Sequence, residues 1–185
     1  MPNTFLILDR DGVINQDSDA YIKGPEEWIP IPGSLEAIAR LNRHGYRVAV
    51  ATNQSGLARG LFDLDRLNAI HQKMARALEQ LGGGIEALFF CPHGPDEGCE
   101  CRKPKPGLLL EIEERFGLDI REIPVVGDSY RDLEAAWAVG AQPILVRTGK
   151  GGRTLAAHPG LEQRIPVFKD LVAVADWVLG GGLKG

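Results

Sequence analysis

The chain has 185 residues, of which 44% are hydrophobic and 25% are charged, and its formal net charge is -4. This length and composition are typical of one globular domain, so we expect a single domain over residues 1–185. The negative net charge gives no general attraction for nucleic acid or for an anionic membrane, and no run approaches the roughly 18–20 apolar residues of a membrane span. The N-terminus also lacks the basic segment and long apolar stretch of a signal peptide. We therefore expect a cytoplasmic monomer that binds neither nucleic acid nor membrane.

Short apolar runs alternate along the chain with helix-like segments. The runs are nearly continuous, which is typical of buried parallel strands, and they cover residues 4–8, 46–51, 86–91, 123–126 and 143–147. Helices are predicted at 34–44, 64–81, 106–116, 130–139 and 169–179, because these segments show apolar periodicity or are bounded by Pro, Ser and Gly. This order predicts a three-layer, Rossmann-like α/β fold with a mainly parallel sheet. Residues 150–165 show no clear pattern, and we expect a surface loop there.

Polar residues follow several of the predicted strands directly. Asp9 and Asp11 come after the first strand, Thr52 to Ser55 after the second, and Asp128 after the fourth, while Lys103 lies on the loop after the third. In open α/β sheets, ligands bind beyond the carboxyl ends of the strands. These side chains are therefore predicted to converge on one edge of the sheet.

The spacing of Asp9 and Asp11 indicates a cation site. Residues two apart in an extended chain face the same side, so Asp9 and Asp11 can share one space with Asp128. Carboxylates so close repel each other unless a cation neutralises them, and oxygen ligands suit Mg²⁺. Gly12 would allow a tight turn beside the site. For Asp9 and Asp11 alone, an ordinary solvated turn is an equally good interpretation, and the other strand ends favour the functional one.

The polar motifs resemble the four ordered motifs of the haloacid dehalogenase (HAD) superfamily of phosphatases. They are Asp9-Arg10-Asp11-Gly12-Val13, Thr52-Asn53-Gln54-Ser55-Gly56, Lys103, and Gly127-Asp128 followed by Asp132. The resemblance implies that Asp9 is the nucleophile and forms an aspartyl-phosphate, and that Asp11 protonates the leaving oxygen and then activates water. It implies that Thr52 and Lys103 hold the phosphoryl oxygens. Mg²⁺ would be bound by Asp9, the backbone carbonyl of Asp11 and Asp128.

A second phosphate-binding candidate fails on its spacing. Residues 149–154 are rich in glycine and basic residues but lack the GxxxxGK[ST] pattern of a P-loop, and they follow the last predicted strand. A basic surface loop is the favoured interpretation.

Three cysteines and one histidine lie within eleven residues. Cys91, His93, Cys99 and Cys101 form a complete Cys₃His set, which is typical of a closed structural Zn²⁺ site. The alternative is a buried Cys91 with two incidental thiols, but Cys99 and Cys101 lie among charged residues where free cysteines are unusual. We expect a small zinc-binding loop at 91–101 that fixes the adjacent Arg102 and Lys103.

This loop, together with "CRKPKPG" and "TNQSGLARG", makes the chain similar to the D-glycero-D-manno-heptose 1,7-bisphosphate 7-phosphatase family. The resemblance implies a Mg²⁺-dependent hydrolase that removes the C7 phosphate of a small sugar bisphosphate, on the route to nucleotide-activated heptose and lipopolysaccharide. It also implies substrate contacts from the following residues: Asp17, Ser18, Asp19, Tyr21, Asn53, Gln54, Ser55, Arg59 and Arg102. No insertion is large enough for a cap domain, so the site should be closed only by loops. The short zinc loop leaves open which anomer is preferred.

Other functions remain as alternatives. A histidinol-phosphate phosphatase would use the same chemistry on another substrate. A mutase would need to exclude water from the phosphoenzyme, which the absence of a cap disfavours. A non-catalytic sugar-phosphate-binding protein would have no use for the pair Asp9 and Asp11. His71 falls one residue from the apolar face of its helix and is expected to be solvated.

Overall fold

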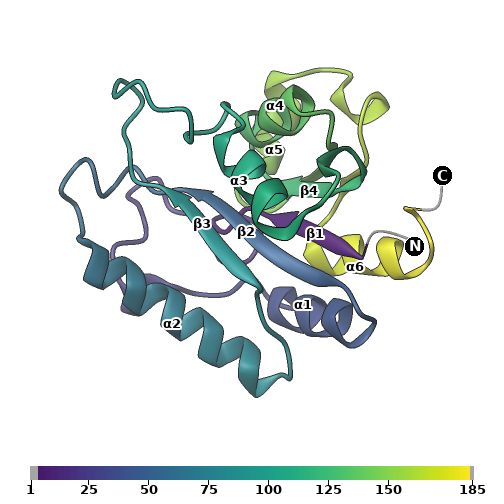
Figure 1. Cartoon of the computed structure of the whole chain (residues 1–185), viewed down its shortest axis with the longest axis horizontal. Helices are drawn as coiled ribbons and strands as arrows, with labels where there is room; N and C mark the ends of the chain where they lie inside the picture. Colours follow the sequence, from purple (N-terminus) through teal and green to yellow (C-terminus); the bar gives the residue numbers. More distant parts are fainter. Residues whose placement is uncertain (1–3, 184–185) are drawn as a thin grey trace.

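The computed structural model describes residues 4–183 and contains one sheet of six parallel strands. The strand order is β3-β2-β1-β4-β5-β6. In sequence order the strands are β1 (Phe5–Leu8), β2 (Arg47–Asn53), β3 (Ala87–Cys91), β4 (Pro124–Gly127), β5 (Gln142–Val146) and β6 (Val167–Phe168). Figure 1 shows the sheet running through the centre of the molecule, with helices on both sides. The predicted three-layer α/β fold is therefore confirmed.

Six α-helices connect or follow the strands. They are α1 (Ser34–Arg43), α2 (Leu64–Gln80), α3 (Gly107–Phe116), α4 (Tyr130–Ala138), α5 (Gly151–Ala157) and α6 (Leu171–Leu179). Short 3₁₀ helices lie at Pro25–Glu27, Ile120–Glu122 and Leu161–Gln163. Two of the long helices begin at an aspartate whose side chain accepts a backbone N–H of the first turn: Asp63 for α2 and Asp170 for α6. Local sequence therefore fixes where these helices start.

Successive side chains of β1 point to opposite faces of the sheet, so the hydrophobic core has one part on each face. Leu6 and Leu8 pack with buried residues of α1, α2 and α6, whereas Phe5 and Ile7 pack with those of α3 and α4. Figure 1 shows the same division, with α1, α2 and α6 on one side of the sheet and α3 and α4 on the other. Because both faces are covered, β1 is buried along its whole length and reads as a continuous apolar run.

The segment after β5 differs from the prediction. Residues 150–165 were expected to form a surface loop, but they begin with α5, and β6 extends the sheet further on. Gly151 and Gly152 open α5, and glycine is a poor helix former, so the sequence gives little helical signal there. Leu161 and Ile165 bury themselves against Leu133 and Leu145 in a small separate core. The segment is ordered by this packing rather than by local propensity.

The sheet topology places two aspartates side by side. The chain runs from β1 outward to β2 and β3, then returns to place β4 on the other side of β1. Strands β1 and β4 pair with Leu8 opposite Val126, and the Asp9 backbone N–H donates to the Val126 carbonyl at 2.9 Å. Asp9 and Asp128 therefore follow neighbouring strands at the point where the strand order reverses, where open α/β sheets bind ligands.

No helix among residues 4–183 is both long and apolar enough to cross a membrane. Within the same residues, no domain is inserted between β1 and α1 or between β2 and α3. The expectation of a fold without a cap domain agrees with this element order.

Candidate active site

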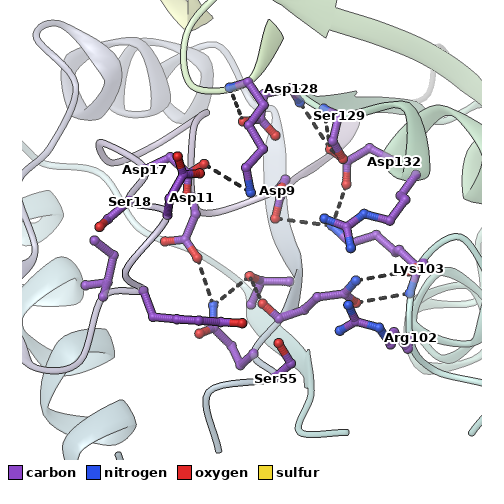
Figure 2. A pocket seen from close by; sticks show the side chains of 18 of the residues that line it. Asp9, Asp11, Asp17, Ser18, Ser55, Arg102, Lys103, Asp128, Ser129 and Asp132 are labelled. Atoms are coloured by element: carbon purple, nitrogen blue, oxygen red, sulfur yellow. Dashed lines mark hydrogen bonds and ion pairs between the residues drawn. The ribbon is translucent and has the colours of Figure 1, made fainter. Parts of the chain in front are cut away.

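A cavity of about 420 Å³ lies beyond the carboxyl ends of β1, β2 and β4. Its wall includes the predicted catalytic and magnesium-binding residues: Asp9, Asp11, Lys103 and Asp128, which are labelled in Figure 2, and Thr52. Every residue predicted to contact the substrate also lines it, namely Asp17, Ser18, Asp19, Tyr21, Asn53, Gln54, Ser55, Arg59 and Arg102. A cavity of this size suits a small polar molecule.

Lys103 is a buried ammonium held between two carboxylates. Its Nζ lies 3.2 Å from Asp9 Oδ1 and 2.7 Å from Asp132 Oδ1, and it donates to the Ala51 carbonyl at 2.9 Å. Figure 2 shows the ion pairs that join Asp9, Lys103 and Asp132. Burial lowers the pKa of Lys103, but Asp132 and Asp9 outweigh this effect and raise it above its usual value. Lys103 is therefore a fixed positive charge beside Asp9.

Asp132 fixes the position of Lys103 and of the backbone that follows β4. Its Oδ2 accepts the backbone N–H groups of Asp128 and Ser129 at 3.1 and 3.0 Å, and the Ser129 hydroxyl at 3.0 Å. Its Oδ1 is the oxygen that binds Lys103. Because both oxygens are occupied, Asp132 positions its neighbours rather than offering an atom to a ligand.

The remaining carboxylates carry more negative charge than Lys103 can neutralise. Burial, followed by repulsion from Asp132, raises the pKa of Asp9 to about 7. Burial and repulsion from Asp9 raise the pKa of Asp128 to about 8. The carboxylates of Asp9, Asp128 and Asp132 lie within 4.8 Å of one another. A divalent cation bound to Asp9 and Asp128 would remove the repulsion.

Asp9 and Asp128 each have an oxygen to offer that cation. Asp9 Oδ1 accepts the Arg10 backbone N–H and faces Lys103, and Asp128 Oδ2 accepts the Lys150 backbone N–H at 2.8 Å. Among the hydrogen bonds of residues 4–183, Asp9 Oδ2 and Asp128 Oδ1 are not used. The oxygen donors present therefore fit the predicted magnesium site.

Two glycines make room for Asp128. Gly12 has φ +85°, and a Cβ atom there would lie 1.9 Å from Asp128 Oδ2. Gly149 has φ +57°, and its Cβ would lie 2.3 Å from the same oxygen. Side chains rarely adopt this backbone conformation, and neither position has space for one. The prediction of a tight turn at Gly12 is confirmed, and Gly149 closes the other side.

Asp11 is surrounded by hydrogen-bond donors. Its Oδ1 accepts from Arg10 Nε at 3.1 Å, Arg10 Nη2 at 2.8 Å and Asn15 Nδ2 at 2.9 Å, whereas Oδ2 accepts from Gln54 Nε2 at 3.1 Å. Burial raises the pKa of Asp11, but the Arg10 guanidinium and these hydrogen bonds outweigh it and hold the pKa below its usual value. Asp11 is therefore a carboxylate in the free protein.

The end of β2 supports both sides of the cavity. Gln54 Nε2 donates to Thr52 Oγ1 at 2.9 Å as well as to Asp11. The Asn53 side chain donates to the Lys103 carbonyl at 3.1 Å and accepts the Lys103 backbone N–H at 3.0 Å. Asn53 thus fixes the backbone that carries Lys103.

Cys91, His93, Cys99 and Cys101 come together beside the cavity, with all four ligand atoms within 4.8 Å of one another. His93 Nδ1 lies 3.5 Å from Cys91 Sγ and 3.4 Å from Cys101 Sγ, and the sulfurs of Cys91 and Cys99 are 3.6 Å apart. A tetrahedron with Zn–S bonds of about 2.3 Å has edges of about 3.8 Å. The Cys91 to Cys101 distance, 3.0 Å, is shorter than such an edge. The donor set and the other three distances fit a four-coordinate Zn²⁺ ion.

Comparisons with known proteins agree with this chemistry. Two family models match, one described as polynucleotide kinase 3 phosphatase over residues 5–132 and one as HAD-hydrolase-like over residues 100–174. A D-glycero-beta-D-manno-heptose-1,7-bisphosphate 7-phosphatase of Bordetella bronchiseptica is 59% identical over 94% of this chain and 97% of its own length. A relative with the same name from Pseudomonas aeruginosa is 56% identical over 97% of this chain and 99% of its own.

The chain belongs to the D-glycero-beta-D-manno-heptose-1,7-bisphosphate 7-phosphatase family of HAD phosphatases.

A solved structure of the same kind shares the fold. The crystal structure of D,D-heptose 1,7-bisphosphate phosphatase from B. bronchiseptica, complexed with magnesium and phosphate, superposes with a TM-score of 0.93. It is 57% identical to this chain and covers 96% of this chain and 99% of its own. The counterpart from Burkholderia thailandensis is 50% identical with a TM-score of 0.75, over 95% of this chain and 98% of its own. The predicted membership in the heptose bisphosphate phosphatase family is thus confirmed.

Sequence reasoning assigned no role to several residues of this cavity, although Asp132 belongs to a quoted motif. Ser129, Arg131, Asp132 and Lys150 line it in addition to the predicted set. Lys150 belongs to the segment interpreted as a basic surface loop, yet its Nζ lies 3.3 Å from Asp17 Oδ2 and its backbone binds Asp128. The signal available was its position after β5, because residues after a parallel strand share the ligand edge of the sheet.

The prediction of a solvated His71 is wrong. The ring is partly buried, and Nε2 lies 3.0 Å from Nη1 of the buried Arg10. The periodicity of α2 placed His71 at the border of the apolar face, and the guanidinium that occupies this border comes from the turn after β1. Because the two residues are 61 positions apart in sequence, local periodicity could not indicate this contact.

Proposed function

We propose that the protein hydrolyses the C7 phosphate of D-glycero-β-D-manno-heptose 1,7-bisphosphate, the reaction that its relatives' names describe. The observation that carries the proposal is the convergence of Asp9, Asp11, Lys103 and Asp128 on one cavity. A nucleophile, a proton carrier, a fixed cation and a metal ligand there match phosphoryl transfer through a covalent intermediate. Neither histidinol phosphate nor a non-catalytic role is favoured by the comparisons.

Magnesium is proposed to be held by the carboxylates of Asp9 and Asp128 and by the backbone carbonyl of Asp11. When bound, the cation would supply positive charge to the phosphoryl oxygens. It would also lower the raised pKa values of both carboxylates and so keep them ionised. The relative from B. bronchiseptica crystallised with magnesium and phosphate supports this assignment.

In the first step, an Asp9 carboxylate oxygen attacks phosphorus while the bond between phosphorus and the C7 oxygen breaks. Lys103 and the Thr52 hydroxyl stabilise charge on the phosphoryl oxygens. Asp11 gives a proton to the leaving oxygen. In the free protein Asp11 is ionised, and the approach of an anionic phosphoryl group raises its pKa, so the proton is acquired with substrate bound.

In the second step, water attacks phosphorus of the aspartyl-phosphate. Asp11, now a carboxylate, accepts a proton from this water, the bond between phosphorus and Asp9 breaks, and inorganic phosphate leaves. The donors around Asp11 favour the carboxylate form that this step requires.

The second phosphate group of the substrate has suitable partners. Arg59, Arg102, Arg131 and Lys150 line the cavity in addition to Lys103. Burial lowers the pKa of Arg102, and the nearby Arg131 guanidinium lowers it further, so these two cations lack a full counter-charge. An anion at this position would relieve their repulsion. This favours a bisphosphate over a monophosphate such as histidinol phosphate.

The Cys₃His cluster is proposed to bind structural Zn²⁺. Four protein ligands leave no open position for a substrate, so the metal would act by holding the loop that carries Arg102 and Lys103. The Arg102 side chain also donates to the His93 carbonyl at 3.4 Å, which links the cluster to the cavity wall.

The test is phosphate release with Mg²⁺ from both anomers of heptose 1,7-bisphosphate, histidinol phosphate and a 3′-phosphorylated oligonucleotide. Phosphorus NMR of the product would show which phosphate is lost. We expect the β anomer to have the highest kcat/KM and to retain its C1 phosphate. Preference for histidinol phosphate or the oligonucleotide would overturn the assigned substrate, and loss of the C1 phosphate would overturn the proposed orientation.

A further inference from the structure

Arg10 is a completely buried cation between two residues of the active site. Asp9 and Asp11 line the cavity, but Arg10 does not, and its buried guanidinium lies inside the protein against Asp11 and α2. Its backbone carbonyl accepts N–H groups from Ile14 at 2.8 Å and from Val13 at 3.3 Å, so the tight turn after β1 fixes its main chain. A buried guanidinium needs an acceptor for each edge of its planar fork.

Two partners satisfy that fork. Nε and Nη2 donate to the same oxygen, Asp11 Oδ1, and Nη1 lies 3.0 Å from His71 Nε2 on α2. A guanidinium can only donate, so Nε2 of His71 accepts and its imidazole is neutral. Burial, followed by the charge of Arg10, lowers the pKa of His71 to about 4, which agrees with this geometry.

The arrangement distinguishes the two oxygens of Asp11. Oδ1 accepts three hydrogen bonds, two from Arg10 and one from Asn15, whereas Oδ2 accepts only from Gln54. The oxygen with the fewest partners is the one that can exchange a proton with a substrate. The orientation of the Asp11 carboxylate therefore depends on where the Arg10 guanidinium sits.

We propose that His71 is a positioning residue for the reaction: by accepting from Arg10 Nη1, it fixes the guanidinium that holds Asp11 Oδ1 and presents Oδ2 to the phosphoryl site. This rests on the proposed function, in which Asp11 carries the proton. Without an acceptor at position 71, Arg10 Nη1 is a buried donor with no partner. The guanidinium then gains by moving toward another acceptor and away from Asp11. The effect should fall on proton transfer and leave substrate binding unchanged.

The test compares His71→Gln, whose side-chain oxygen can still accept, with His71→Leu and His71→Met, which cannot. Gln72→Leu, on the exposed neighbouring position of α2, is the control for adding an apolar residue to this helix. For variants with native thermal unfolding profiles, kcat and KM for heptose 1,7-bisphosphate are measured at saturating Mg²⁺. We expect the Leu and Met variants to lose roughly tenfold in kcat with KM changed less than about twofold, and the Gln variant to recover most of this loss.

A double-mutant cycle separates positioning from general support of the fold. In an Asp11→Asn background, His71→Leu should cause no further loss of kcat, because the group that it positions has gone. Equal kcat loss in the Leu and Gln variants, or an undiminished effect in the Asp11→Asn background, would overturn the inference. So would wild-type kcat in both the Leu and Met variants. A wild-type protein that releases no phosphate from any substrate would instead refute the proposed function.

Discussion

The two candidate metal sites of this protein are built in different ways. The carboxylates of Asp9 and Asp128 follow adjacent buried strands, and each accepts a backbone N–H group. Of the Cys₃His ligands, only Cys91 lies on a strand, and the other three belong to the loop between β3 and α3. The sheet can therefore arrange the first site without a metal, whereas the second site would depend on the proposed Zn²⁺ to hold the loop. Predictions that affect one site and spare the other test this difference.

The largest expected effect is that of Asp9→Asn. The amide cannot attack phosphorus, so kcat should fall at least about 10³-fold. Zinc content and the thermal midpoint should stay near wild type, because Lys103 keeps Asp132 as a partner and the substitution removes a carboxylate that burial disfavours. Steady-state kinetics and metal analysis check this. Retention of more than a tenth of the activity would exclude Asp9 as the nucleophile.

Cys99→Ser should damage the loop and spare the sheet. We expect zinc to be lost and kcat/KM for the bisphosphate to fall about 10- to 100-fold, because Arg102 and Lys103 follow this loop and small displacements are costly. Circular dichroism should report unchanged helix content. Glu100→Gln, at an exposed position of the same loop, is the matched control. A zinc-free variant with full activity would show that the metal is not needed to position these cations.

Magnesium binding should weaken as the pH falls. The pKa values of Asp9 and Asp128 are raised to about 7 and about 8, so protons occupy these groups at pH 6 and must leave when the metal binds. The apparent Mg²⁺ affinity should therefore increase between pH 6 and 8, by up to about tenfold per pH unit for each proton released. Calorimetric titrations of zinc-loaded protein across this range measure it. A pH-independent affinity would contradict the raised pKa values.

A prediction that involves neither candidate metal site concerns the stability contributed by His71. His71 has an ordinary pKa of 6.5, and its pKa in the folded protein is lowered to about 4. The unfolded chain therefore takes up a proton first as the pH falls, and stability decreases between about pH 6.5 and 4, by about 3 kcal/mol in total. His71→Gln should remove this part of the pH dependence. Urea unfolding of the wild type and of His71→Gln at several pH values measures how the pH dependence of stability differs between them. No difference would show that His71 is solvated in the folded protein.

Much of the fold could be predicted because its central strands are buried on both faces. Continuous apolar runs mark β1 and β4, and the first polar residue after each is a site residue. The topology then brings Asp9 and Asp128 together without further information. The prediction was wrong after β5, because Gly151 and Gly152 weaken the helical signal of α5, which is ordered by packing.

The residues of the site to which the sequence assigned no role share one physical reason. Arg10, Asp132 and Lys150 act through partners that lie far away in sequence or through backbone groups. No periodicity reports such contacts. The position of Arg10 between two aspartates was the signal available, because a guanidinium pairs readily with a neighbouring carboxylate.

The contacts around Asp128 also determine when the active site can form during synthesis. Thr148 Oγ1 donates to the Gly12 carbonyl at 2.7 Å, and Thr154 Oγ1 donates to the Asp128 carbonyl at 2.9 Å. The turn after the first strand is therefore completed by residues near the other end of the chain. The ribosome must have made and released the chain as far as Thr154 before the turn after β1 and Asp128 have all of these contacts. The surroundings of Asp9 and Asp128 should therefore stay incomplete until late in translation.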